Sequence, residues 1–325
     1  MSVLVFAENW NGRFKKSTFE AISYGAEIAK QNGSTVTAVV IGNVNDADMK
    51  ALGKYGAAKV LSLKNDKLNT LVPQAYASVV AEAAKKEGAK VVVLSYTYSG
   101  KAIAGRLAVK LQAGLVAGAT ALPSSLSPFT VRKKCFSGKG LTDVTVSTDV
   151  KIIALTPNAY QVNAGSAEAS VESFSPSIKD PDFRTVSKEV KTTSGKIPLT
   201  EAEIVVSAGR GLKGPDNWGM VETLAAELGA ATACSKPVAD VGWRPHHEHV
   251  GQTGITIGPN LYIAIGISGA IQHLAGVSSS KVIVVINSDP EAPFFKAADY
   301  GIVGDAFEVV PKLIEEVKKF KAAHH

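Results

Sequence analysis

Three segments in the second half of the chain hold residue types and spacings that could do chemistry. The first, Gly209-Arg-Gly-Leu-Lys-Gly214, fits the pattern GxGxxG. Between a strand and a helix, such a loop can bring backbone N–H groups against a pyrophosphate. A nicotinamide site would also need an acidic residue after the next strand, but Ser235 and Lys236 stand there. A tight strand-to-helix turn is the simpler explanation of the glycines.

The second segment, Gly266-Ile-Ser-Gly-Ala270, is similar to the nucleophile elbow of α/β-hydrolases. A hydrolase needs an acid and then a histidine later in the chain. Here His273 follows Ser268 before any acid, and the other two later histidines end the chain. We therefore expect Ser268 to offer its hydroxyl at a helix N-terminus, where the helix dipole favours a phosphate.

The third segment, His246-His-Glu-His249, suggests a metal site. Zinc sites draw ligands from two elements with defined spacing, and neither HExxH nor a distant Cys/His pair occurs. We predict a polar loop and no metal. What remains is a glycine-rich polar set without a nucleophile–base pair, which is typical of a site whose cofactor supplies the chemistry.

The elements that would position these residues alternate between strand and helix. In the first third, apolar runs predict strands and a stripe of Phe19, Ile22, Ala26 and Ala29 predicts a helix. This order favours a parallel sheet covered by helices. The predicted strands are Val3–Ala7, Val36–Ile41, Lys59–Leu63 and Val91–Leu94, and the further helices lie at Gln74–Lys86 and around Ile103, Leu107 and Leu111.

Residues 128–195 change character. Short runs separated by Gly and Asp turns predict strands without a helical pattern, and the stretch from Gly165 to Pro198 is rich in Ser, Lys and Thr. We expect outer strands followed by a linker. The predicted strands are Phe129–Phe136, Val144–Ser147 and Lys151–Leu155.

A second α/β pattern begins at Ile204. Strands are expected at Ile204–Val206, Ala231–Cys234, Leu261–Ile265, Lys281–Ile286 and Tyr300–Val303, with helices around Trp218–Leu228 and Val309–Phe320. The sequence therefore predicts two α/β domains. Residues 1–195 form an N-terminal parallel-sheet domain with added strands and a terminal linker, and residues 196–325 form a doubly wound domain.

Composition excludes other classes. The net charge of +6 is modest, and the basic clusters Arg132-Lys-Lys134 and Lys318-Lys319 lack interleaved aromatic residues, so we expect no nucleic-acid partner. No uncharged apolar stretch reaches about 18 residues, so no membrane insertion is expected. The N-terminal residues run into a strand without a targeting pattern. We expect a cytoplasmic protein, or a mitochondrial matrix protein that has been processed.

One family carries the same residues in the same order. The run Val250-Gly-Gln-Thr-Gly254 is followed by Pro259-Asn-Leu-Tyr-Ile-Ala-Ile-Gly-Ile-Ser-Gly-Ala-Ile-Gln-His-Leu-Ala-Gly276, then by Ile286-Asn-Ser-Asp-Pro-Glu-Ala-Pro-Phe-Phe295 and Ala298-Asp-Tyr-Gly-Ile-Val-Gly-Asp305. With Gly209-Arg-Gly-Leu-Lys213, this resembles the alpha subunit of electron-transfer flavoproteins. The match is nearly continuous over the second domain and looser at Phe6-Ala-Glu8.

The resemblance implies FAD in the second domain. Thr253 would hydrogen-bond flavin N5, Gln252 would lie beside the ring or its ribityl chain, and His273 would donate toward flavin O2, where charge gathers on reduction. Ser268 and the adjacent backbone, including Gly266, would face the pyrophosphate.

Further positions follow from the same resemblance. Asn287 and Asp305 would hold the adenosine half, Ser235 would place a hydroxyl near the ring, and Arg210 belongs to the matching glycine loop. Lys236 departs from the family, which commonly carries Arg over the isoalloxazine, so the planar fork is lost. His249 also stands where a different polar residue is expected.

The family implies an electron carrier rather than an enzyme. It would form a heterodimer with a beta subunit, take electrons from acyl-CoA or similar flavin dehydrogenases of fatty acid beta-oxidation, and pass them to a membrane quinone oxidoreductase. Electron bifurcation with a second flavin in the beta subunit stays open, as do the identity of the dehydrogenase and the redox potentials. The alternatives are a stand-alone nicotinamide oxidoreductase and a nucleotide-binding regulator.

Overall fold

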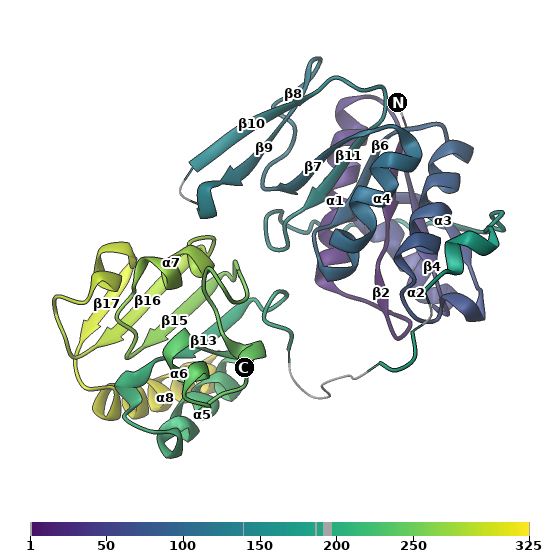
Figure 1. Ribbon diagram of the computed structural model, residues 1–325. Coiled ribbons are helices and arrows are strands. Elements are labelled where there is room, and N and C mark those ends of the chain that lie inside the picture. Colours follow the sequence, from purple (N-terminus) through teal and green to yellow (C-terminus); the bar gives the residue numbers. More distant parts are fainter. Residues whose placement is uncertain (1, 139, 186, 191–196, 325) are drawn as a thin grey trace. The chain divides into compact units, whose positions relative to one another are not determined.

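The computed structural model describes residues 2–138, 140–185, 187–190 and 197–324. The chain forms two compact units: Met1–Cys135 with Leu141–Thr192, and Thr193–His325 with Phe136–Gly140 (Figure 1). Each is an α/β unit built on a parallel-dominated sheet, so the predicted fold class is confirmed. The expected boundary between residues 195 and 196 lies outside the described residues.

The first unit is built on a ten-stranded sheet. Its pairings are parallel from β7 to β12. The strand order is β10 (Gly140–Val146), β9 (Phe129–Cys135), β7 (Gly114–Ala119), β11 (Lys151–Leu155), β6 (Ala89–Ser95), β1 (Ser2–Phe6), β4 (Val36–Ile41), β5 (Ala57–Leu63) and β12 (Ser170–Ser173), with β8 (Ser125–Leu126) beside β9.

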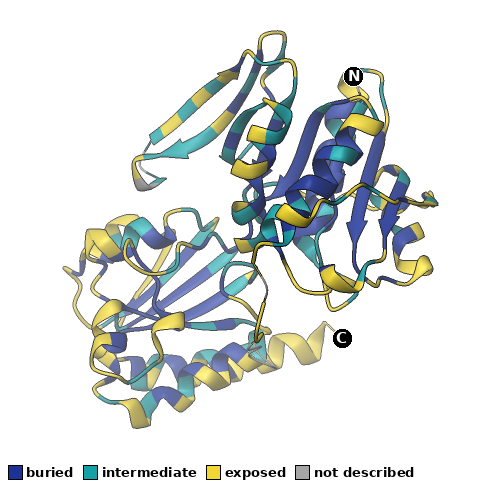
Figure 2. Ribbon diagram, turned by 45° about the vertical axis from the view of Figure 1, so that its right-hand side comes forward, coloured by how far each residue is buried: buried dark blue, intermediate teal, exposed yellow. Residues whose placement is uncertain are grey.

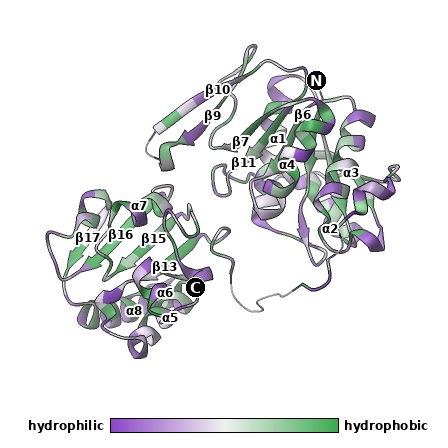
Figure 3. Ribbon diagram, in the orientation of Figure 1, coloured by the Kyte–Doolittle hydropathy of each residue, from purple (hydrophilic) through white to green (hydrophobic). Residues whose placement is uncertain are grey.

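Helices bury both faces of this sheet, as Figure 2 shows by the dark blue strands. Successive side chains of β1 point to opposite faces: Val3 and Val5 pack with helix α1 (Lys16–Gln31), whereas Leu4 and Phe6 pack with α3 (Pro73–Lys86) and α4 (Tyr98–Leu111). Burial on both faces explains why the central strands are continuous apolar runs, green in Figure 3. The short helix α2 (Asp46–Ala51) precedes β5.

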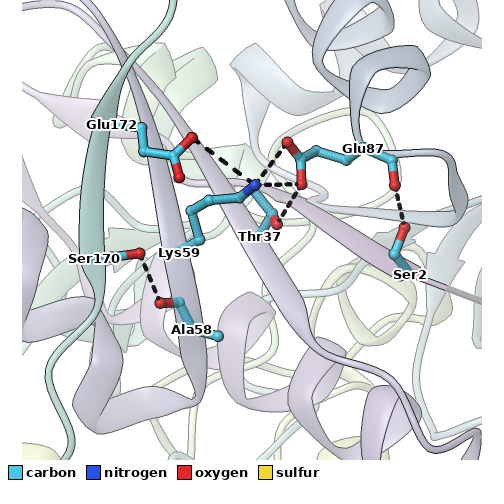
Figure 4. Close-up of polar contacts among 7 residues, drawn as sticks. All are labelled: Ser2, Thr37, Ala58, Lys59, Glu87, Ser170 and Glu172. Carbon is cyan, nitrogen blue, oxygen red and sulfur yellow. Dashed lines mark hydrogen bonds and ion pairs between the residues drawn. The ribbon is translucent and has the colours of Figure 1, made fainter.

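A lysine ties the outer strand β12 to the sheet (Figure 4). Nζ of Lys59 on β5 lies 2.8 Å from a carboxylate oxygen of Glu87 and 3.9 Å from one of Glu172 on β12. Thr37 on β4 donates to Glu87 at 3.1 Å. Because these side chains are partly solvated, the pairs contribute at most about 1 kcal/mol each. They add a side-chain contact to the backbone pairing of β12 with β5.

The opposite edge carries the added strands. β9 pairs antiparallel with β7 and with β8, and it ends at Cys135, a half-buried free thiol. The strand predicted to reach Phe136 stops one residue earlier because Phe136 has a φ of +50°. β10 starts at Gly140, ahead of the predicted Val144. β7 and the small hairpin of β2 (Asn9–Trp10) and β3 (Arg13–Phe14) were not predicted.

The second unit is a doubly wound five-stranded sheet whose neighbouring strands all run parallel. The order is β14 (Ala231–Cys234), β13 (Ile204–Ala208), β15 (Leu261–Ile265), β16 (Val282–Asn287) and β17 (Tyr300–Val303). Helices α5 (Gly219–Leu228), α6 (Lys236–Asp240) and α8 (Ala306–Ala323) bury one face, and α7 (Ile271–Val277) lies on the other.

The chain order reverses between β13 and β15. From β13 the chain passes to β14 on one side, and then to β15 on the other. In open α/β sheets, ligands bind in the crevice at the carboxyl ends of the strands at such a switch point. Among the described residues, no helix is long and apolar enough to cross a membrane.

Candidate cofactor site

A cavity of about 550 Å³ opens at the carboxyl ends of β13, β14, β15 and β16, at the switch point of the second unit. Cofactor and ligand cavities span roughly 300–1,000 Å³, so the volume suits a bound small molecule. The walls come from the loops that follow these four strands, from residues 249–253 in the connection between β14 and β15, and from the start of α7. Residues distant in sequence therefore meet because most of them lie in connections at the same edge of a parallel sheet.

Glycines make the floor of the cavity. A Cβ on Gly209 would lie 2.3 Å from the carbonyl oxygen of Gly266, and one on Gly211 would lie 2.6 Å from its Cα. Gly266 itself has a φ of +58° and would meet Gly211 at 2.8 Å. The two loops thus touch backbone to backbone, joined by a hydrogen bond from Gly211 N to Gly266 O of 3.1 Å. The third glycine of the pattern, Gly214, has nothing within 4 Å.

A second close backbone contact joins helix α7 to the loop that contains Gly251. A Cβ on Gly276 of α7 would come within 2.5 Å of Gly251, so glycine lets the helix pack against this loop. The backbone N–H of Gln252 donates to the carbonyl of Gln272 on α7 at 2.7 Å. These contacts hold Gln252 and Thr253 at the edge of the cavity, where both are exposed.

The cavity brings together nine of the ten residues that the sequence suggested. They are Arg210, Ser235, Lys236, Gln252, Thr253, Gly266, Ser268, His273 and Asn287. The tenth, Asp305, does not line it. Its carboxylate caps α8 by accepting from Phe307 N at 2.9 Å, and it lies 3.7 Å from Nζ of Lys213.

Two of the lining residues have fixed local roles. The amide of Asn287, at the end of β16, donates to the carbonyl of Ile267 at 3.0 Å and accepts from Asp289 N at 3.1 Å. It thereby joins the loops after β15 and β16. Ser235 is buried at the N-cap position of α6 without a capping hydrogen bond from its side chain. Ser268 is exposed before α7 and is not its N-cap, which is Ala270.

Sequence reasoning did not propose Asp289 or Gln272 as site residues, although both line the cavity. Both lie in the runs that carry the family resemblance, so their position in those runs is the signal that could have identified them. Gly209 and Gly211 were noticed only as a motif. His249, noted as a departure, also lines the cavity.

The electrostatics favour an anionic guest. Arg210 and Lys236 are exposed at the cavity, and neither forms an ion pair within the part of the chain that the structure describes. Asp289 is the one carboxylate among the described lining residues. Burial lowers the pKa of His249, with further lowering by Lys236 and His246 against the raising effect of Asp240. Two cationic side chains thus face a cavity whose base is formed by glycine backbone, an arrangement that suits phosphate groups.

His273 is buried at the start of α7. Its Nε2 lies 2.8 Å from the hydroxyl of Tyr262 on β15. Burial lowers the pKa of His273 to about 4; the nearby His249 adds to this, and the backbone of Val250 opposes it. The imidazole is therefore neutral at pH 7. Because its ring bonds to Tyr262, it is not arranged as a base for Ser268, in agreement with the rejection of a hydrolase.

The histidine-rich segment has a structural role. Both carboxylate oxygens of buried Glu248 accept from Arg244, at 2.7 and 2.9 Å, and Arg244 also donates to Glu222 at 2.9 Å. No group of three metal-ligating side chains occurs within the described ranges. Cys234, at the end of β14, is buried, which raises the pKa of its thiol to about 12 and makes it unreactive.

Comparison with known proteins gives matches over both units. The profile of the electron transfer flavoprotein domain matches residues 3–179, and that of the electron transfer flavoprotein FAD-binding domain matches residues 198–278. The chain is 40% identical over 316 residues to the electron transfer flavoprotein subunit alpha of Syntrophomonas wolfei, covering 97% of this chain and 98% of that one.

Other relatives match over the same length. The chain is 41% identical to the electron transfer flavoprotein subunit alpha of Bacillus subtilis over 321 residues, with 98% of this chain and 97% of that one covered. It is 33% identical to the protein FixB of Clostridium saccharobutylicum over 326 residues, with 99% and 97% covered.

Proposed function

The chain belongs to the electron-transfer flavoprotein alpha-subunit family, and from this premise we propose how its cavity and its partners serve electron transfer. Its second domain binds FAD, and the protein is an electron-transfer flavoprotein subunit. The comparisons do not support the stand-alone nicotinamide oxidoreductase, and neither Ser235 nor Lys236 supplies the acid that such a site needs.

The residues of the cavity fit FAD. The glycines let the loops after β13 and β15 touch backbone to backbone, because any Cβ there would clash with the other loop, and a glycine-rich loop after a strand is the usual binding site of a pyrophosphate. Arg210 and Lys236 add positive charge for a dianionic cofactor. The observation that carries the assignment is this cavity at the switch point of the domain that matches the FAD-binding profile.

We assign roles to the side chains as the resemblance suggested. Gly266 and Ser268 would hold the pyrophosphate, Thr253 and Gln252 would contact the ring edge and ribityl chain, and His273 would donate toward flavin O2. Ser235 and Lys236 would lie near the ring. Asn287 and Asp305 would serve the adenosine half, with Asp305 acting from outside the cavity wall through its position beside Lys213.

Bound FAD would supply all the redox chemistry, and the protein would supply binding, orientation and charge. The described residues that line the cavity include no nucleophile–base pair, since His273 bonds to Tyr262 and the Cys234 thiol is buried. We therefore propose a carrier that turns over no small substrate itself.

The partners are proposed from the family. A beta subunit would complete a heterodimer through the first domain, residues 1–195, and the linker ahead of Pro198 would let the FAD domain, residues 196–325, move. Acyl-CoA or similar flavin dehydrogenases of fatty acid beta-oxidation would be the donors, and a quinone oxidoreductase the acceptor, in the cytoplasm.

The test is to co-express the chain with a beta subunit and purify the complex under gentle conditions. We expect a flavin absorbance with one FAD per alpha chain, bleached by an acyl-CoA only when a dehydrogenase is added. A complex that contains no flavin and takes none up would refute the proposal. Bleaching by NADH instead would identify a bifurcating member.

A further inference from the structure

The imidazole of His273 has a buried hydrogen-bond partner on the sheet of the second unit. Tyr262 lies on β15, fully buried, on the face that α7 covers. Its hydroxyl and Nε2 of His273 are 2.8 Å apart. Phe294 packs against both rings, with centroid separations of 6.3 Å to Tyr262 and 5.7 Å to His273. The rings of Tyr262 and Phe294 thus pack against the imidazole, and the Tyr262 hydroxyl is the side-chain partner that orients it.

The chemistry of the two groups indicates which partner donates. Burial raises the pKa of Tyr262 above its ordinary value, so the phenol keeps its proton. A phenol hydroxyl is a stronger hydrogen-bond donor than a neutral imidazole N–H, and an unprotonated imidazole nitrogen is a stronger acceptor than a phenol oxygen. Within the described residues, Nδ1 of His273 has no hydrogen-bond partner, whereas Nε2 lies 2.8 Å from the phenol oxygen. The phenol proton is therefore directed to Nε2, and the ring proton is left on Nδ1.

We propose that Tyr262 is the positioning residue of the cavity: its hydroxyl donates to Nε2 of His273 and holds the imidazole neutral with its proton on Nδ1. A neutral ring with one unprotonated nitrogen carries a fixed dipole, so His273 acts on the bound flavin through an oriented dipole rather than through a charge. The consequence for FAD depends on the proposed function, whereas the tautomer is a property of the chain itself.

The test compares Tyr262→Phe with Tyr24→Phe in the full-length chain. Both changes remove one hydroxyl from a buried tyrosine, and the Tyr24 hydroxyl donates to the carbonyl of Ala121 at 2.9 Å in the first unit. ¹⁵N spectra of histidine-labelled protein, assigned with a His273→Gln variant, report which ring nitrogen carries the proton. We expect Nδ1–H in the wild type and in Tyr24→Phe, and a mixture of tautomers in Tyr262→Phe.

Flavin measurements complete the test. In Tyr262→Phe we expect FAD to bind about two- to tenfold more weakly, the size of one lost hydrogen bond. We also expect a shifted flavin absorbance, with neither effect in Tyr24→Phe. The positioning role is refuted if the neutral imidazole of wild-type His273 carries its proton on Nε2, or if the tautomer is unchanged in Tyr262→Phe. If the tautomer changes as expected but the wild type binds no FAD, the proposed function fails and the hydrogen-bond assignment stands.

Discussion

The contact between the two glycine loops predicts a sharp difference between two substitutions in one motif. Gly211→Ala would place a Cβ 2.6 Å from Gly266 Cα and 2.9 Å from its carbonyl oxygen. Ordinary contacts lie at about 3.5–4.0 Å, so the loops must separate by roughly 1 Å. The obstacle is backbone and cannot rotate away. Gly214→Ala meets nothing within 4 Å and serves as the control.

The expected magnitudes follow from this geometry. Overpacking of this kind costs about 1–3 kcal/mol, whereas an unobstructed surface change stays within about 0.5 kcal/mol. With an m-value of about 2 kcal/mol/M, Gly211→Ala should lower the urea midpoint by about 0.5–1.5 M. FAD affinity should fall at least about tenfold, because the displaced loop forms the floor of the cavity.

Urea unfolding followed by the fluorescence of buried Trp218, together with FAD titration, measures both effects. If Gly211→Ala and Gly214→Ala share one midpoint and one FAD affinity, the loops do not touch as described and the glycine floor is not what admits the cofactor.

Three further outcomes are expected. Because the folded pKa of His273 is about 4 and its unfolded value is about 6.5, stability should fall by about 3 kcal/mol as pH drops from 6.5 to 4. Urea unfolding across that range should show less of this loss in His273→Gln, and an equal loss would contradict the assignment. Lys236→Ala should lower the first one-electron potential of the bound flavin by several tens of millivolts, about 1–2 kcal/mol of charge interaction, and Lys236→Arg should restore it. Identical potentials in a redox titration would show that Lys236 faces solvent. Arg244→Ala removes the guanidinium that neutralises the buried carboxylate of Glu248, so thermal unfolding should show a loss of about 3 kcal/mol that Glu248→Gln partly restores in the double variant. If the stability losses of the two single variants simply add up in the double variant, Arg244 and Glu248 do not stabilise each other.

Much of the fold could be predicted because the central strands are buried on both faces and appear as plain apolar runs. Val36–Ile41 is one such run, and its predicted bounds are those of β4. β7 was missed because two thirds of Gly114–Ala119 is glycine and alanine, which weakens a strand signal. Its place between β9 and β11 comes from pairing with residues far along the chain.

The candidate site was likewise predicted only in part. The resemblance named most of the cavity-lining residues, but periodicity could not show that Gly211 and Gly266 touch, because that contact joins loops more than fifty residues apart. Tyr262 looked only like a strand residue until its hydrogen bond to His273 was seen. Asp305 stays a prediction for the adenosine half. Its spacing from Glu308 is also that of a helix N-terminus, and the helix indeed begins at Ala306.

The two cysteines differ in burial, so we expect a thiol-reactive label to attach at one position. Cys234 is buried with a strongly raised thiol pKa, whereas Cys135 is half-buried at the end of β9 in the first unit. A maleimide dye should therefore attach at Cys135 alone, without mutagenesis. Bound FAD would absorb in the second unit, so energy transfer between dye and flavin would report the separation of the two units directly. Time-resolved fluorescence of one labelled sample could then follow their relative movement as partners are added.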